Sequence, residues 1–205
     1  MSGRVIVLAS RNAKKLAELR RILEPVVPGV RVLGLSDVQH YEEPAETEPT
    51  FEGNALLKAR AAVVATGLPS LADDSGLCVD ALNGMPGVLS ARWSGDLGSD
   101  KDETNNRLLL AQLADVPDER RAAEFRCALA LVLPGDAEYL QVGVMRGRVL
   151  RSTRGTGGFG YDPLFAADGY DVSTAELSVQ DKDAISHRGK ALRAMAPLAA
   201  EVLAR

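Results

Sequence analysis

The segment RVIVLASRNAKKLAELRRILEP, Arg4–Pro25, decides the fold class. Arg4–Ala9 is a short apolar run typical of a buried strand, and Ala13–Glu24 has apolar residues at helical spacing. Pro25 is expected to end this helix because proline cannot continue the helical hydrogen-bond ladder. A buried strand that turns directly into an amphipathic helix is typical of an α/β protein.

The rest of the chain continues this alternation and contains no repeat or linker, so we expect one domain over residues 1–205. Further helices are expected from the cap Thr50 to Thr66 with Gly67 at its end, over Asp100–Ala114, and over Ser186–Ala204 with a kink at Pro197. Extended segments are expected at Leu71–Ala72, Phe125–Leu133, Tyr139–Val144, Gly147–Thr153 and Leu164–Ala167. Short connections between the strands of the second half favour antiparallel pairing, so the sheet should be mixed.

Composition excludes several classes of protein. The chain has 205 residues, of which 46% are hydrophobic and 25% charged, and these values are ordinary for a globular domain rather than a disordered one. The net charge of −4 argues against a duplex nucleic-acid partner. No apolar run approaches the roughly 20 residues that cross a bilayer, and no signal peptide is recognisable. We therefore expect a cytoplasmic protein without a membrane partner.

Cysteine and histidine usage restricts the choice of metal. Cys78 and Cys127 are far apart, and His40 and His187 are the only histidines. Because these residues form no CxxC motif and no other Cys/His spacing of a zinc site, a structural zinc site is nearly excluded. Cys127 alternates with apolar residues and is expected to be a buried thiol. Any metal should be a hard ion held by carboxylates, and Mg²⁺ is the default.

The turn between the first strand and the first helix is a candidate phosphate site. Such turns present backbone N–H groups and the positive end of the helix dipole to a ligand. The motif is not a P-loop, because GxxxxGK[ST] is absent. The alternative is a capped helix with solvated lysines. The turn consists of Ser10, Arg11, Asn12, Ala13, Lys14 and Lys15.

Paired acids provide a candidate metal site. Asp73 and Asp74 follow the short strand at Leu71–Ala72, and neighbouring side chains of an extended segment point in different directions. At most one of the two carboxylates should therefore face a given metal. The alternative is that the pair is only an acidic turn and binds no metal. Residues 32–57 contain six acids and no Lys or Arg. One of these acids could face a metal-bound substrate, whereas the others should be solvated.

Two later segments could bind the organic part of a ligand. Gly155–Pro163 formally contains GxGxxG, but no helix follows it, so the dinucleotide-binding fingerprint is rejected. Its glycines and aromatic rings favour either a loop that stacks on a base or a hairpin with core aromatics. Lys182–Lys190 places bases at a helix start, where they are unfavourable without a nearby anion or polar ligand. A solvated turn is the alternative.

As a set, these motifs resemble the inosine/xanthosine triphosphate pyrophosphatase family. The resemblance extends over nearly the whole chain and is carried by the following segments: SRNAKK (10–15), TFEGNALLKA (50–59), ADDSGL (72–77), GMPGVLSARWSG (84–95), GGFGYDPLF (157–165) and AISHRGKAL (184–192). The family implies an elongated α/β fold with a central mixed sheet, two lobes with a nucleotide cleft between them, and a homodimer. It also implies Mg²⁺-dependent hydrolysis of non-standard purine nucleoside triphosphates (ITP, dITP and XTP) to the monophosphate and pyrophosphate.

The resemblance also implies roles for individual residues. Asp74 would bind the metal and accept a proton, and Glu46, with Glu43 close behind, would be the second metal-facing acid. The phosphates would be held by the turn at residues 10–15, chiefly through Ser10, Asn12 and Lys15, with Ser75 as a further substrate contact. The base pocket would consist of Phe159, Gly160, Tyr161, Asp162, Lys182, His187 and Arg188.

The sequence departs from the family's pattern at one position, and two other functions are alternatives to the one that the family implies. Gly53 stands where the family often has an acid, which removes a capping-box partner for Thr50. The first rival is a pyrophosphatase for other nucleotides, such as modified pyrimidines or dTTP. The second is a nucleotide- or RNA-binding module without catalysis, which would need no metal at Asp74.

Overall fold

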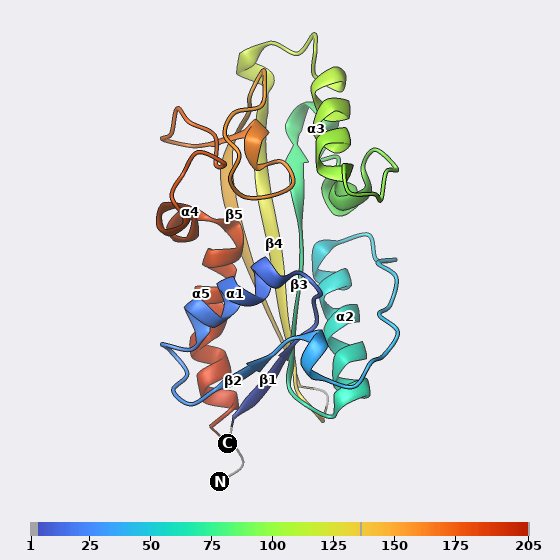
Figure 1. The fold of residues 1–205 in the computed structure, drawn as a ribbon, viewed down its shortest axis with the longest axis vertical. Coiled ribbons are helices and arrows are strands. Elements are labelled where there is room, and N and C mark those ends of the chain that lie inside the picture. The colour runs from blue at the N-terminus through green and yellow to red at the C-terminus, as the bar shows by residue number, and fades with distance from the viewer. Residues whose placement is uncertain (1–3, 136, 205) are drawn as a thin grey trace. The chain divides into compact units, whose positions relative to one another are not determined.

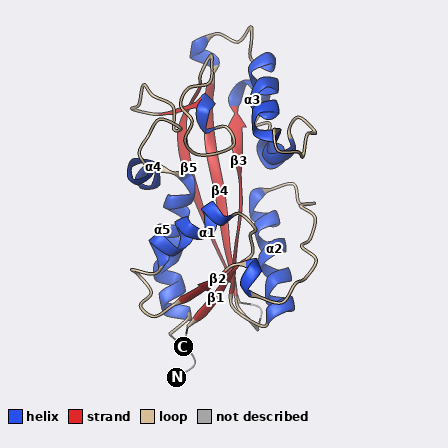
Figure 2. Ribbon diagram, in the orientation of Figure 1, coloured by secondary structure: helices blue, strands red, loops and turns tan. Residues whose placement is uncertain are grey.

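The computed structural model describes residues 4–135 and 137–204, and strands and helices alternate in the first half of the chain (Figures 1 and 2). The first strand, β1 (Val5–Leu8), and the first helix, α1 (Ala13–Leu23), confirm the prediction from Arg4–Pro25. The other strands are β2 (Arg31–Leu33), β3 (Ser70–Val79), β4 (Ala122–Val132), β5 (Glu138–Val149) and β6 (Phe165–Ala167). The other α-helices are α2 (Phe51–Thr66), α3 (Lys101–Gln112), α4 (Val179–Ile185) and α5 (His187–Val202).

The strands form a mixed sheet in the order β2-β1-β3-β4-β5-β6. β1 pairs in parallel with both β2 and β3, whereas β5 and β6 are antiparallel. The predicted α/β class with a mixed sheet is therefore confirmed. The carboxyl end of β1 pairs with the first residues of β3, with Leu8 opposite Leu71, so the turn that follows β1 lies next to the paired acids of β3.

Two of the predicted strands are wrong in extent. β3 does not end at Ala72 but continues through Asp73 and Asp74 to Val79. β5 is one strand rather than two, and Gly147 lies inside it, opposite Ala167 of β6. A Cβ at Gly147 would lie 2.1 Å from the carbonyl oxygen of Ala166, so this glycine allows close approach of two strands instead of forming a turn.

The predicted helices are confirmed, and two short elements, β2 and α4, were not predicted. Thr50 caps α2 by accepting a hydrogen bond from the Gly53 N–H at 3.1 Å, and Gly67 ends the helix in the left-handed conformation. A Cβ at Gly53 would meet the Glu48 side chain at 2.7 Å, so the glycine makes room for that side chain. Pro197 lies inside α5, and the kink there stays a prediction.

The chain divides into two compact units, each with its own hydrophobic core. The first unit is the described part of Met1–Asp74, Cys127–Gly143 and Arg188–Arg205, and the second is Ser75–Arg126 with Val144–His187. In the first unit α1 and α5 pack against β1 and β4, and Cys127 is buried among them as expected. Figure 1 shows α2 on the other side of these strands.

The core of the second unit joins α3 to the strands around it. Leu109 of α3 and Leu113, directly after the helix, belong to one core with Phe125 of β4 and Phe165 of β6. Single-domain organisation over 1–205 and a nucleotide cleft between two lobes stay predictions. Among the described residues, no helix is both long and apolar enough to cross a membrane.

Candidate active site

The turn at Ser10–Lys15 is a capped helix start. The Asn12 side chain accepts hydrogen bonds from the N–H groups of Lys14 and Lys15 at 2.9 and 3.3 Å. The Ser10 hydroxyl accepts one from the Asn12 N–H at 3.2 Å, and Ala13 is the first residue of α1. These backbone donors are therefore already satisfied within the chain. The turn can still offer its positive dipole and the side chains of its bases to an anion.

The bases of this turn face carboxylates. The Lys15 ammonium lies 2.8 Å from Oδ2 of Asp73, and both groups are largely buried. Arg11 forms an ion pair with Glu43, but its side chain is mostly exposed. A buried pair holds Lys15 in one orientation, whereas the exposed Arg11 pair is weak and can exchange partners.

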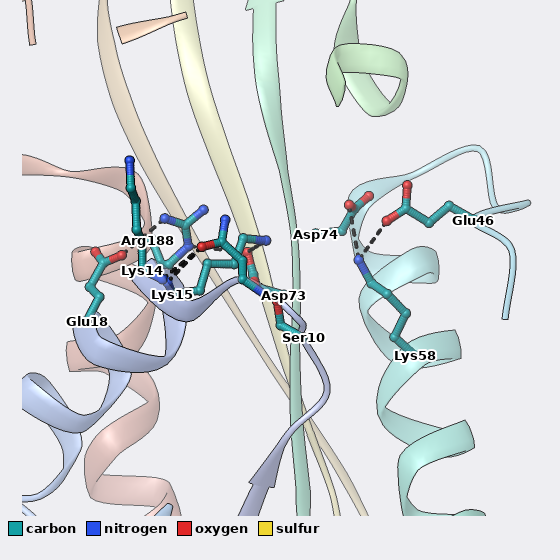
Figure 3. Close-up of polar contacts among 10 residues, drawn as sticks. Ser10, Lys14, Lys15, Glu18, Glu46, Lys58, Asp73, Asp74 and Arg188 are labelled. Carbon is teal, nitrogen blue, oxygen red and sulfur yellow. Dashed lines mark hydrogen bonds and ion pairs between the residues drawn. The ribbon is translucent and has the colours of Figure 1, made fainter. Parts of the chain in front are cut away.

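The two adjacent acids of β3 point to opposite sides of the strand, as the sequence predicted (Figure 3). Asp73 faces Lys15 and the Arg188 guanidinium, whose Nε lies 3.3 Å from its Oδ2. Asp74 faces α2, where Nδ2 of Asn54 donates to it at 3.1 Å and the Lys58 ammonium lies at 3.3 Å. Strand alternation thus gives one carboxylate to each face of the sheet.

The environments of the two acids set different pKa values. Burial alone would raise the pKa of Asp73, but the charges of Lys15, Arg188 and Lys58 lower it far below the usual range. The pKa of Asp74 is raised, first by burial and then by the negative charge of Glu46, against the opposing effect of Lys58. Asp73 is therefore the more acidic carboxylate and is charged near neutral pH, whereas Asp74 is the more basic one.

Asp74 and Glu46 converge on one lysine that the sequence analysis missed. Lys58 lies 2.8 Å from Oε1 of Glu46 and 3.3 Å from Oδ1 of Asp74 (Figure 3). Asn54 connects Asp74 to the segment that carries Glu46, because its side chain also accepts the backbone N–H of Glu48 at 3.0 Å. The signal was present in the sequence, since Asn54 and Lys58 are four residues apart on one face of the predicted helix.

The donor set fits a magnesium ion. Asp74 and Glu46 supply carboxylate oxygens from two different segments, and Mg²⁺ is commonly held by one or two carboxylates together with water and phosphate oxygens. Within residues 4–135 and 137–204, no three His, Cys, Asp or Glu side chains are grouped so that they could hold a metal by themselves. Such a site would hold its ion jointly with an anionic ligand.

Arg188 lies in a buried charge network of the first unit. Its Nη1 lies 3.1 Å from Glu18 of α1, and its Nε faces Asp73. All three side chains are buried. Glu18 was not predicted, because in the sequence it looks like an ordinary polar position of an amphipathic helix.

The glycine-rich loop of the second unit is held by its own aspartate. Asp162 accepts hydrogen bonds from the Phe159 N–H at 2.8 Å and from the Thr174 hydroxyl at 2.9 Å, and it pairs with Lys182. The Lys182 ammonium also lies 5.5 Å from the centre of the Phe159 ring. Phe159 is one of the exposed large hydrophobic residues, with 36% of its surface exposed.

The other predicted base contacts have structural partners. Tyr161 is buried, and its hydroxyl donates to the Ser90 carbonyl at 2.9 Å. The ring of His187 stacks on Phe125 with 4.9 Å between centres. Gly160 and Ser75 are partly buried, Gly160 in the loop and Ser75 within β3, directly after Asp74.

Comparison with known proteins places the chain in a family of small α/β proteins. The model of the Ham1 family matches residues 6–198, and the chain belongs to this family. It is 60% identical over 201 residues to a protein named dITP/XTP pyrophosphatase from Nocardia farcinica, covering 98% of this chain and 97% of the relative. A relative of the same name from Frankia alni is 58% identical over 201 residues, covering 97% and 98% of the two chains.

Solved structures agree with this placement. A nucleoside-triphosphatase, dITP/XTP pyrophosphatase, from Mycobacterium abscessus is 55% identical with a TM-score of 0.78, covering 94% of this chain and 99% of that one. A HAM1 protein from Coxiella burnetii is 40% identical with a TM-score of 0.86, covering 96% and 98%. The family expected from the sequence motifs is confirmed.

Proposed function

We propose that this protein hydrolyses non-standard purine nucleoside triphosphates (ITP, dITP and XTP) to the monophosphate and pyrophosphate and so cleanses the nucleotide pool. The observation that carries the proposal is the arrangement of Asp74, Glu46 and Lys58, in which a carboxylate of raised pKa lies beside a second acid and a base. The printed names of the relatives support the substrate class and the reaction.

The reaction breaks the anhydride bond between the α and β phosphates with one molecule of water. Asp74 accepts a proton from this water, because burial and Glu46 raise its pKa and make it the stronger base of the β3 pair. Lys58 remains charged beside it and stabilises the carboxylate before the proton moves. No covalent intermediate is required.

The phosphates meet the positive groups of the first unit. Lys15 and Arg11, at the start of α1, stabilise the charge that moves onto the pyrophosphate leaving group. Asp74 and Glu46 would hold Mg²⁺ together with phosphate oxygens. When bound, the ion neutralises phosphate charge and activates the anhydride for attack.

The base is assigned to the glycine-rich loop at residues 157–162, to Lys182 of α4, and to His187 and Arg188 at the start of α5. Phe159 stacks on the purine, and Lys182, beside its ring, donates to the 6-oxo group. His187 and Arg188 remain proposed base contacts, although the partners described above already orient both side chains. Adenine carries an amino donor at position 6, which would face these donors without an acceptor.

The proposal includes Mg²⁺ as cofactor, a homodimer and a cytoplasmic location. Nucleoside triphosphates are made and used in the cytoplasm, so an enzyme that cleanses their pool acts there. No nucleic-acid or membrane partner is proposed.

Product identification tests the proposal. Purified protein with Mg²⁺ should convert ITP, dITP and XTP to monophosphate and pyrophosphate, and removal of the metal with EDTA should stop the reaction. Preference for dTTP or a modified pyrimidine nucleotide would indicate the related pyrophosphatase instead. Nucleotide binding without any product would indicate a binding module.

A further inference from the structure

Helix α3 holds both backbone groups of one glycine in the proposed base-binding loop. The Gly160 N–H donates to Oδ2 of Asp102 at 2.7 Å, and its carbonyl accepts from Nδ2 of Asn106 at 3.0 Å. Asp102 and Asn106 are four residues apart and therefore lie on one face of the helix. Their two hydrogen bonds fix the peptide groups on both sides of Gly160, next to Phe159 and Tyr161.

Gly160 needs such restraint because of its conformation. Its φ of 62° lies in the left-handed region, which glycine adopts without steric cost. A Cβ at this position would meet nothing within 4 Å, so the position requires glycine for its backbone conformation and not for lack of space. The two hydrogen bonds from α3 restrain the backbone conformation of Gly160.

Asn106 is an unusual choice if its role is only to stabilise the fold. It is buried, and its Oδ1 has no hydrogen-bond partner among the described residues, although its Nδ2 is satisfied by Gly160. A buried acceptor without a partner destabilises the folded state. An apolar side chain would avoid this cost, so the amide is explained by the bond that it makes to Gly160.

The neighbouring residue is also held, from the other side of the loop. Asp162 accepts the Phe159 N–H at 2.8 Å and pairs with Lys182. The backbone of residues 159 and 160 is thus fixed by three hydrogen bonds, while the Phe159 residue stays exposed. This combination gives an exposed aromatic residue on a hydrogen-bonded backbone, which lowers the entropy lost when a ligand binds.

We propose that Asp102 and Asn106 are positioning residues that orient Phe159 for stacking on the purine. The inference rests on the proposed function, in which Phe159 binds the base. The two residues act through Gly160 and do not touch the substrate themselves. Loosening Gly160 should therefore weaken binding of the base without changing the phosphate chemistry.

Kinetics of Asp102→Ala and Asn106→Ala provide the test. Each variant should raise the KM for ITP and the inhibition constant of IMP about tenfold, the usual effect of losing one supporting hydrogen bond, with kcat within about twofold. Inhibition by pyrophosphate, which has no base, should stay unchanged. In the double variant the effects should be less than multiplicative, because either loss frees the same glycine.

Three control variants separate positioning from stability and charge. Asp102→Asn keeps an acceptor for the Gly160 N–H and should restore a KM near the wild-type value. Glu103→Gln removes a charge from an exposed neighbouring position and should change neither constant. Leu109→Ala creates a cavity in the core beneath α3 and should lower the melting temperature without raising the KM.

Folding of every variant is checked through the single tryptophan. The Trp93 indole donates to Gln112 at the end of α3 at 2.9 Å, so its fluorescence reports on the packing of this helix. Unchanged KM in both alanine variants, or equal losses in Asp102→Asn and Asp102→Ala, would overturn the inference while wild-type ITP hydrolysis stands. Failure of the wild type to hydrolyse ITP would overturn the proposed function and this inference with it.

Discussion

Asp73 and Asp74 are identical in chemistry, yet their surroundings give them different tasks. Asp73 lies between two cations, Lys15 and Arg188, and Asp74 lies beside Lys58 and the second acid, Glu46. The sequence predicted that only one of the pair would face a metal, because neighbouring side chains of a strand point in opposite directions. The spacing of Asn54 and Lys58 on one helix face was visible in the sequence, but the bridge from Lys58 to both acids depends on where α2 packs against β3.

The assignment of Asp74 as proton acceptor predicts a large difference between two isosteric variants. Asp74→Asn should lower kcat for pyrophosphate release from ITP by at least ~10²-fold, the scale expected for loss of a general base. Asp73→Asn should lower kcat less, because Asp73 only orients cations. Steady-state kinetics with saturating Mg²⁺ measures both. Near-normal turnover in Asp74→Asn together with loss of activity in Asp73→Asn would contradict the assignment.

The depressed pKa of Asp73 predicts a pH dependence of stability. A carboxyl whose pKa is lower in the folded than in the unfolded protein stabilises the fold above its unfolded pKa, about 3.9, and this contribution is lost as the pH falls toward the folded value. The free energy of unfolding should therefore fall more steeply between pH 6 and pH 3 in the wild type than in Asp73→Asn.

Urea unfolding at a series of pH values checks this prediction. Glu52→Gln, on the first turn of α2, is the control for removal of a carboxylate. Parallel pH profiles of the wild type and Asp73→Asn would show that the folded pKa of Asp73 is not depressed.

At the scale of elements, local sequence signals predicted the helices and failed for two strands. Thr50 and Gly67 mark the ends of α2 because caps depend on residues within one turn of the helix end. The paired acids suggested the end of β3, but partners distant in sequence satisfy their charges and allow the strand to continue. Gly147 similarly reflects the close approach of β6, which no local pattern reveals.

Arg121 directly precedes β4, and its substitution gives the clearest prediction for stability. Its buried guanidinium donates to the carbonyls of Leu113, Val149 and Leu150 at 2.7, 2.9 and 2.8 Å. Arg121→Met would keep the apolar stem but leave three carbonyls without this donor. The Leu113 carbonyl keeps the Val116 N–H as a donor, so at about 1–3 kcal/mol for each of the other two carbonyls the free energy of unfolding should fall by at least about 2 kcal/mol.

Chemical denaturation measures the effect of Arg121→Met. The exposed neighbour Arg120 provides the matched control, and Arg120→Met should change the free energy of unfolding by less than about 0.5 kcal/mol. A similar small change in both variants would show that water replaces the guanidinium at these carbonyls.

At the scale of the whole molecule, the sequence predicted the α/β class and the family but not the division into two cores. β3, β4 and β5 each contribute residues to both units, so no linker or change in composition marks the boundary. The residues proposed to bind phosphate belong mainly to the first unit, and those proposed to bind the base belong mainly to the second. Each sequence motif alone was a weak indication of the family, whereas the whole set of motifs in this order identified it.

The ratio of kcat/KM for ITP to kcat/KM for ATP tests the central claim most directly. Donors that face position 6 of the purine should favour ITP by at least about 100-fold, because the adenine amino group leaves them unmatched. The products from ITP should be IMP and pyrophosphate. Equal values for the two substrates, a preference for ATP, or release of inorganic phosphate in place of pyrophosphate would contradict the account.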